Sequence, residues 1–178
     1  MAGILKVDKY QDFNGNDIMT SDGSGNLTLN NAALKATPAF LAYPSADQSI
    51  SNSSQTLVQI NTEVFDSDGC FDTSTYKFTP TVAGKYLVYA QIAPNTATDF
   101  DGFEVQIYKN EVSGSGAVAL NGGRNEYGDA RITQNIVDMN GSSDFLYLYT
   151  FQTSGGSIDI HGGESYRTFF GAYKLIGA

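Results

Sequence analysis

The segment CFDTSTYKFTPTVAGKYLVYA (residues 70–90) decides the fold. Polar and apolar residues alternate on both sides of its middle, with Phe78 on the apolar face of the first half and Tyr86 on that of the second. Aromatic and β-branched residues suit the pleated surface of a strand, and Pro80 with Gly84 marks a bend between strands. The pattern predicts a β-hairpin.

The rest of the chain has the turn spacing of an antiparallel β-protein. Clusters of Gly, Ser, Thr, Asn and Asp recur about every ten residues, which is typical of a sandwich or barrel. No long segment shows a helical period, and 178 residues suffice for one β-domain with a sizeable core. We therefore expect an all-β fold of two antiparallel sheets.

Charge and cysteine content exclude several kinds of partner. The formal net charge is −9, so a nucleic-acid backbone would be repelled. No apolar run is long enough to span a membrane, and the apolar part of residues 1–9 is too short for a secretory signal. The single cysteine, Cys70, rules out an intrachain disulfide framework and fits synthesis in a reducing cytoplasm.

The chain divides into an N-terminal arm, residues 1–36, and a head, residues 37–178. The arm is cut into short strands by Asn14-Gly15-Asn16 and Asp22-Gly23-Ser24-Gly25, and its apolar residues are too few to form a core. We expect it to be an extended segment that docks on another protein; the alternative is a mobile N-terminus. The candidate attachment residues are Leu5, Val7, Tyr10, Phe13 and Ile18.

Three expected strands carry large apolar groups on both faces: residues 85–93, 144–152 and 167–177. Such a sheet needs two covers, one from its own core and one from another subunit. The candidate axis-facing residues of the resulting trimer are Tyr89, Tyr147, Tyr149, Phe151, Phe170 and Tyr173. The alternative is that some of them are ordinary core residues.

The order of these segments resembles the globular heads of the complement C1q and tumour-necrosis-factor families. The resemblance rests on PAFLAY (38–43), VFDSDGCFDTSTYKFTPTVAGKYLVYAQI (64–92), IYKN (107–110) and FFGAYKLIG (169–177). Tyr76 stands where these heads usually have Gly. The resemblance implies a ten-strand jelly roll, and a trimer packed through one sheet along a threefold axis.

The arm carries a second resemblance. ILKVDKYQDFNGNDIMTSDGSGNLTL (4–29) is similar to the N-terminal segments of virion proteins of tailed phages. This resemblance implies a virion location after synthesis in the host cytoplasm. It also implies that the arm binds the major capsid protein or another virion protein.

The sequence offers little for catalysis, and we expect no enzyme. The only histidine, His161, has no Gly-x-Ser-x-Gly elbow to work with, and a loop or strand-end histidine is the ordinary interpretation. Cys70 lacks partners at zinc spacing. Asp99 and Asp101 lie in a loop sequence typical of solvated carboxylates.

Calcium is the one cofactor that the sequence raises. Asp66, Asp68 and Asp72 resemble the start of a calcium loop, but the twelve-residue pattern with its terminal Glu is missing. Asp and Gly are also the residues that any exposed loop between strands uses.

Two functions remain. The first is a capsid decoration or cement protein, whose arm grips the particle and whose trimeric head projects. The second is a tail-fibre or head-fibre protein that binds a host receptor or surface glycan, with Phe100, Phe103 and Tyr127 as the candidate exposed aromatics. The short segment before the head favours the first, because a fibre usually carries a long shaft of repeats.

Overall fold

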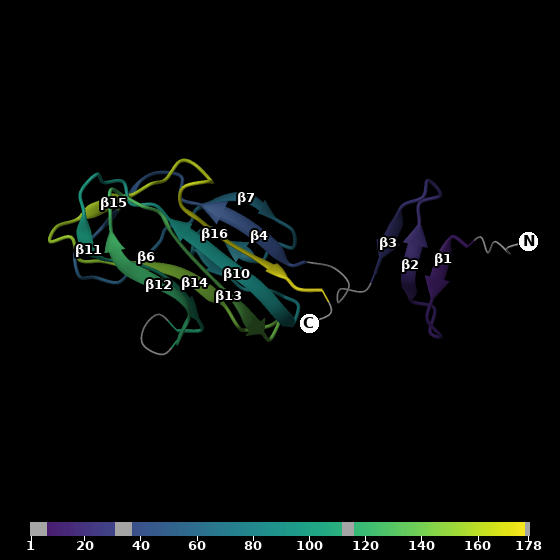
Figure 1. The fold of residues 1–178 in the computed structure, drawn as a ribbon. Coiled ribbons are helices and arrows are strands. Elements are labelled where there is room, and N and C mark those ends of the chain that lie inside the picture. Colours follow the sequence, from purple (N-terminus) through teal and green to yellow (C-terminus); the bar gives the residue numbers. More distant parts are fainter. Residues whose placement is uncertain (1–6, 31–36, 112–115, 177–178) are drawn as a thin grey trace, which may run out of the picture.

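The computed structural model describes residues 7–30, 37–111 and 116–176, and their regular structure is β-strand. Figure 1 shows a sandwich of strands formed by the head, with the three strands of the arm set apart from it. The five-stranded sheet has the order β13 (Arg131–Met139), β10 (Gly84–Ile92), β16 (Phe169–Lys174), β4 (Ala39–Tyr43) and β7 (Thr62–Asp66).

The second sheet of the head is six-stranded. Its order is β12 (Ala117–Asn125), β11 (Phe100–Lys109), β14 (Leu146–Gln152), β9 (Lys77–Phe78) and β8 (Phe71–Asp72), and β6 (Thr56–Leu57) also pairs with β14. A two-stranded ribbon is formed by β5 (Gln48–Ile50) and β15 (Ile158–Ile160). Every pair is antiparallel, so the expected two-sheet antiparallel sandwich is confirmed.

The core lies between the two sheets and is built around stacked phenylalanines. The ring of Phe40 lies 4.5 Å from that of Phe71, 4.6 Å from Phe78 and 5.1 Å from Phe170, measured between centroids. These four residues come from both sheets, and all are buried. Full burial of one such side chain stabilises a fold by about 1.5–3 kcal/mol, so this cluster holds the sheets together.

The segment 70–90 is not a hairpin, and that expectation is wrong. β9 pairs with β8 and β14, whereas β10 pairs with β13 and β16 in the other sheet. The chain therefore crosses the sandwich between Phe78 and Gly84, and the rings of Phe78 and Tyr86 meet in the core, 5.8 Å apart. Alternation looks the same whether a chain turns back within one sheet or passes to the facing sheet, because both strands bury one face.

The arm folds as a sheet of its own. β1 (Lys9–Gln11), β2 (Asp17–Ser21) and β3 (Leu27–Leu29) form an antiparallel meander. The expected strand breaks at residues 14–16 and 22–25 are therefore confirmed as its two turns. The expected boundary between residues 36 and 37 borders a segment, 31–36, that lies outside the described residues, and it stays a prediction.

The two turns of the arm are built alike, because the pattern Asp-x-x-Gly-Asn recurs after ten residues. In the first turn, Asp12 accepts hydrogen bonds from the backbone of Asn14 and from the backbone and side chain of Asn16. In the second, Asp22 accepts the equivalent bonds from Ser24 and Asn26. The glycines at 15 and 25 have φ of 82° and 94°, which suits glycine.

Candidate functional site

The outward side of the five-stranded sheet is the candidate functional site. Residues of β10 alternate: Tyr86 and Val88 point into the core, and Leu87 and Tyr89 point outward. The neighbouring strands continue this outward row, because directly opposed residues of antiparallel strands share a face. We call this surface the aromatic face; its apolar side chains are Leu41, Tyr43, Phe65, Leu87, Tyr89, Ile132, Ile136, Phe169 and Tyr173.

Tyr89 lies at the centre of the aromatic face. It pairs with Gly171, and a Cβ on this glycine would lie 2.5 Å from Cζ of Tyr89. The ring therefore occupies the space above Gly171. It packs edge-on against Phe169 at 6.2 Å and Tyr173 at 6.4 Å, and its burial beside Tyr173 raises the pKa of its hydroxyl.

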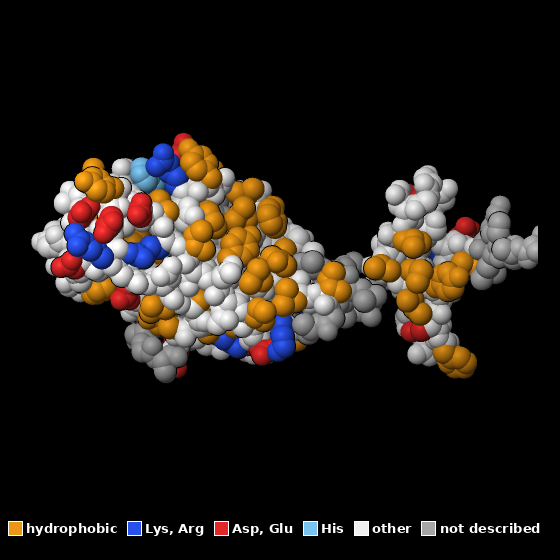
Figure 2. Space-filling model, viewed as in Figure 1, with side chains coloured by type: hydrophobic (Ala, Val, Ile, Leu, Met, Phe, Trp, Pro, Cys, Tyr) orange, Lys and Arg blue, Asp and Glu red, His pale blue; other side chains and the backbone are white. Residues whose placement is uncertain are grey.

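Much of the aromatic face is open to solvent in the single chain. Ile132 and Ile136 are 52% and 55% exposed, and Phe65 and Tyr173 are also exposed. Figure 2 shows hydrophobic side chains gathered over β4, β16 and β10. A contiguous exposed apolar patch of this kind is typical of surfaces that take part in protein–protein interaction.

The six expected axis-facing residues do not share one surface. Tyr89 and Tyr173 lie on the aromatic face, but Phe170 is fully buried in the core. Tyr147, Tyr149 and Phe151 point outward from β14 and therefore lie on the opposite side of the sandwich. Within the pair Phe169-Phe170 it is Phe169 that faces outward, because β16 places Phe170 against Ala90 on the core side.

The outward side of β14 forms a smaller ladder of rings. Tyr149 packs against Tyr108 at 5.6 Å and against Tyr147 at 6.2 Å, and Tyr147 packs against Phe145 at 5.3 Å. These rings are partly shielded by one another, and Tyr108 is buried. The ladder therefore leaves less open apolar surface than the aromatic face.

The three aspartates named as calcium candidates accept hydrogen bonds from residues near them in the chain. Asp68 accepts one from the hydroxyl of Ser67 at 2.6 Å. Asp66 accepts a hydrogen bond from the backbone of Phe71 at 2.8 Å. Asp72 accepts bonds from the hydroxyl and backbone of Ser74 and from Thr75, and these bonds lower its pKa. Among the described residues, no group of three or more His, Cys, Asp or Glu side chains is placed to hold a metal ion. Calcium binding stays a prediction.

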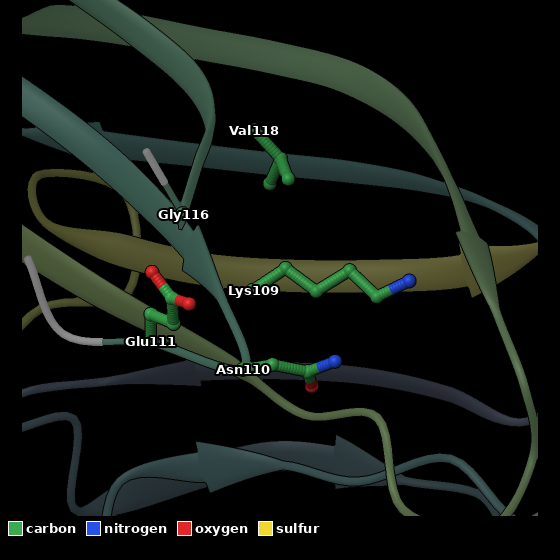
Figure 3. A pocket seen from close by; sticks show the side chains of 5 residues that line it. All are labelled: Lys109, Asn110, Glu111, Gly116 and Val118. Atoms are coloured by element: carbon green, nitrogen blue, oxygen red, sulfur yellow. The ribbon is translucent and has the colours of Figure 1, made fainter. Parts of the chain in front are cut away.

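The described residues offer no arrangement typical of catalysis. His161 has Arg167 as its side-chain partner, at 3.1 Å, and no hydroxyl or thiol of the described residues is bonded to its ring. An open depression beside the end of β11 is lined by Lys109, Asn110, Glu111, Gly116 and Val118 (Figure 3). The ammonium group of Lys109 is paired with Asp144 at 2.9 Å. The lysine is therefore not available as an unpaired charge for a ligand in this depression.

Of the three aromatics named as glycan candidates, one is accessible. Phe100 and Phe103 are buried in the core, which contradicts the expectation that they are exposed. They lie on β11, whose alternation turns both rings inward across a bulge. Tyr127 is 80% exposed in the turn between β12 and β13.

The role of the candidate attachment residues stays a prediction, and the structure gives only their exposure. Val7, Tyr10, Phe13 and Ile18 are all exposed to solvent, and Leu5 lies outside the described residues. Sequence reasoning missed Met19, Leu27 and Leu29, which belong to the same small sheet. Their signal was present in the sequence, since the ten-residue repeat places Met19 and Leu29 at equivalent positions.

No helix in the described part of the chain is long and apolar enough to cross a membrane.

Comparison with known proteins identifies the fold of the head through structural similarity, not through sequence similarity. No family model matches the sequence, and no curated protein matches it. The chain is similar in structure to the Eiger TNF of S. frugiperda, with 13% identity, TM-score 0.52, and coverage of 79% of this chain and 93% of that one. For the globular domain of zebrafish complement 1qA protein, identity is 12%, TM-score 0.52 and coverage 78% and 98%.

Murine APRIL at pH 8.0 gives a similar result, with 15% identity, TM-score 0.55, and coverage of 77% of this chain and 98% of that one. Each match spans nearly the whole of the other chain, so the likeness concerns a complete head rather than a fragment. The chain therefore has the jelly-roll fold shared by tumour-necrosis-factor and complement C1q heads.

Proposed function

We propose that the protein is a non-enzymatic homotrimer whose heads join through the aromatic face. One observation carries this proposal: nine apolar side chains occupy the outward side of a sheet whose inward side already faces the core. Exposing so large an apolar patch to water is unfavourable. Identical copies arranged around an axis can bury it, because each presents the same apolar surface. The likeness of the head to TNF and C1q heads supports the same assembly.

We infer further that the trimer is a virion structural protein of a tailed bacteriophage, a capsid decoration protein. The arm would bind the major capsid protein or another virion protein, and the head would project. The resemblance of the arm sequence to phage virion proteins motivates this role. One observation is in keeping with it: among the described residues, the strands of the arm pair with one another rather than with strands of the head. Within the part of the chain that the structure describes, β1 and β3 are the edge strands of this sheet, and an edge strand can extend a partner's sheet.

A second candidate function is a fibre head that binds a receptor or glycan. It is favoured by the exposed ring of Tyr127, whose backbone amide donates to Asp99 at 3.0 Å and which therefore sits in a fixed turn. Rings held in this way on a rigid scaffold are suited to stacking against sugars.

Mass measurement and imaging test these proposals in order. The full chain should have the mass of three copies at micromolar concentration, and a monomer with a folded head would contradict the proposed assembly. Labelled protein added to particles that lack it should then decorate the capsid faces. Label at the tail would instead support the fibre function.

A further inference from the structure

The small sheet of the arm has one apolar side. Tyr10, Met19 and Leu29 are directly opposed across its three strands, so their side chains form one row on the same face. Leu27 lies two residues before Leu29 on the same side and is 64% exposed. Figure 2 shows hydrophobic side chains gathered on the visible side of this sheet. We call the side of the sheet defined by Tyr10, Met19, Leu27 and Leu29 the arm face.

The directly opposed row on the other side of the same sheet is polar. Lys9, Thr20 and Thr28 form the corresponding row there, and Lys9 is paired with Asp17 at 2.8 Å. The sheet thus has the pattern of a layer that meets water on one side only. An apolar side of so small a sheet, open to water in the single chain, is suited to being covered by a second layer.

The connection to the head determines which molecules lie near the arm face. The backbone of Pro38, at the start of the head, accepts a hydrogen bond from Lys174, and Ala39 pairs with Tyr173 of the aromatic face. The chain therefore leaves the head beside the proposed trimer contact. From Leu29 to Ala39 the backbone spans at most roughly 35 Å, at about 3.3–3.6 Å per residue.

We propose that the three arm faces of one trimer pack against one another, so that each is covered by the other two copies. The short tether holds the three sheets at an effective concentration on the order of millimolar, and their identical apolar rows suit each other. The polar sides and the Asp-x-x-Gly-Asn turns then face outward and remain free for the particle. This inference rests on the proposed trimer.

Cross-linking of the full chain tests the inference, with a matched control in the adjacent residue. Met19→Cys places a thiol on the arm face, and Thr20→Cys places one on the polar side of the same strand. Cys70 is buried and stays in place. With a short bis-maleimide at dilute protein, Met19→Cys should give covalent dimers at least about tenfold faster than Thr20→Cys, as expected for tethered partners.

A second pair of variants controls for the possibility that Met19→Cys or Thr20→Cys unfolds the arm sheet locally. Leu29→Cys and Thr28→Cys lie opposite Met19 and Thr20 and should repeat the difference. Equal rates for both sides would overturn the packing of the arms. The same holds if the arm-face thiols react singly and become protected only when particles are added, because the virion would then be the occupant. The mass of each uncross-linked sample separates this failure from failure of the trimer: a monomer overturns both.

Discussion

The ring of Tyr89 on β10 lies directly over Gly171 on β16, the residue opposite it in the sheet. The glycine has no side chain to stand between the ring and the backbone, so the ring lies close to the sheet. Phe169 and Tyr173 flank it on either side. The ring at the centre of the aromatic face consequently lies close to the backbone of β16, which suits the close packing that we propose for a second copy.

Gly171→Ala tests whether the position of the Tyr89 ring over Gly171 matters for assembly. The added Cβ would lie 2.5 Å from Cζ and 2.6 Å from Oη of Tyr89, so the ring must swing away. Because the clash is with the far end of a side chain and not with the backbone, the fold of the single head should change little in stability. Assembly should weaken, which analytical ultracentrifugation over a dilution series would detect. An unchanged dissociation constant would show that the position of the Tyr89 ring does not matter for assembly.

Tyr173→Asp places a charge on the aromatic face. Desolvating an unpaired ion costs several kcal/mol, so the trimer should dissociate while the head stays folded. Tyr127→Asp makes the same chemical change in an exposed turn and serves as the control. Mass measurement of both variants decides the matter. A trimeric Tyr173→Asp variant with wild-type thermal stability would place the contact elsewhere.

A chain that begins at Thr37 should remain a folded trimer and lose attachment to the particle. The strands of the arm pair only with one another among the described residues, so the sheets of the head keep all their hydrogen-bonded neighbours. Circular dichroism and mass measurement would report the fold and assembly. Particles lacking the native protein would report attachment, and normal decoration by the shortened chain would assign attachment to the head.

Asp144 should make the head sensitive to acid. Burial opposes its charge, but hydrogen bonds from Asn110 at 2.7 Å and from Lys109, together with one from the backbone of Asn140, hold its pKa below the ordinary value. A carboxyl whose pKa is lowered by folding contributes stability above its unfolded value, about 3.9, and loses that contribution as the pH falls through the folded value.

Asp144→Asn should therefore cost about 2 kcal/mol at pH 7, as for a charged hydrogen bond lost in a buried site. The difference from wild type should shrink as the pH falls below about 4, where the carboxyl of the unfolded chain becomes protonated while the native carboxyl, with its lowered pKa, still holds its charge. Chemical denaturation at pH 7 and pH 3, at one protein concentration, measures both values. A difference of the same size at the two pH values would show that the charge of Asp144 contributes nothing.

The sequence predicts the class of fold well, because alternation is a local signal. Residues 144–152 and 167–177 contain β14 and β16, and residues 85–93 match β10 to within one residue at each end. Each of these strands has large apolar groups on both faces, as expected. The sequence predicts less well how successive strands are connected. Pro80 and Gly84 announce a change of direction, but whether the chain stays in one sheet depends on where β14 and β16 lie, far away in sequence.

The side of each strand is also decided by distant partners. Nothing in Phe169-Phe170 tells which ring is buried, and the answer comes from pairing with Gln91 and Ala90. β12 is harder still, because Gly122 and Gly123 weaken its strand pattern, and its register comes from its neighbour β11. The sequence thus predicts that an outward apolar surface exists, but it does not determine which residues form the aromatic face.

The ten-residue spacing of the two arm turns allows the arm to evolve in length by whole units. Each unit contributes one turn, anchored by Asp12 or Asp22, and one following strand. Met19 and Leu29 hold the same place in successive units and point to the same side. Duplication or loss of a whole unit would therefore lengthen or shorten the segment by one strand without inverting its sides. Descendants of one ancestor can in this way differ in reach while keeping the head unaltered.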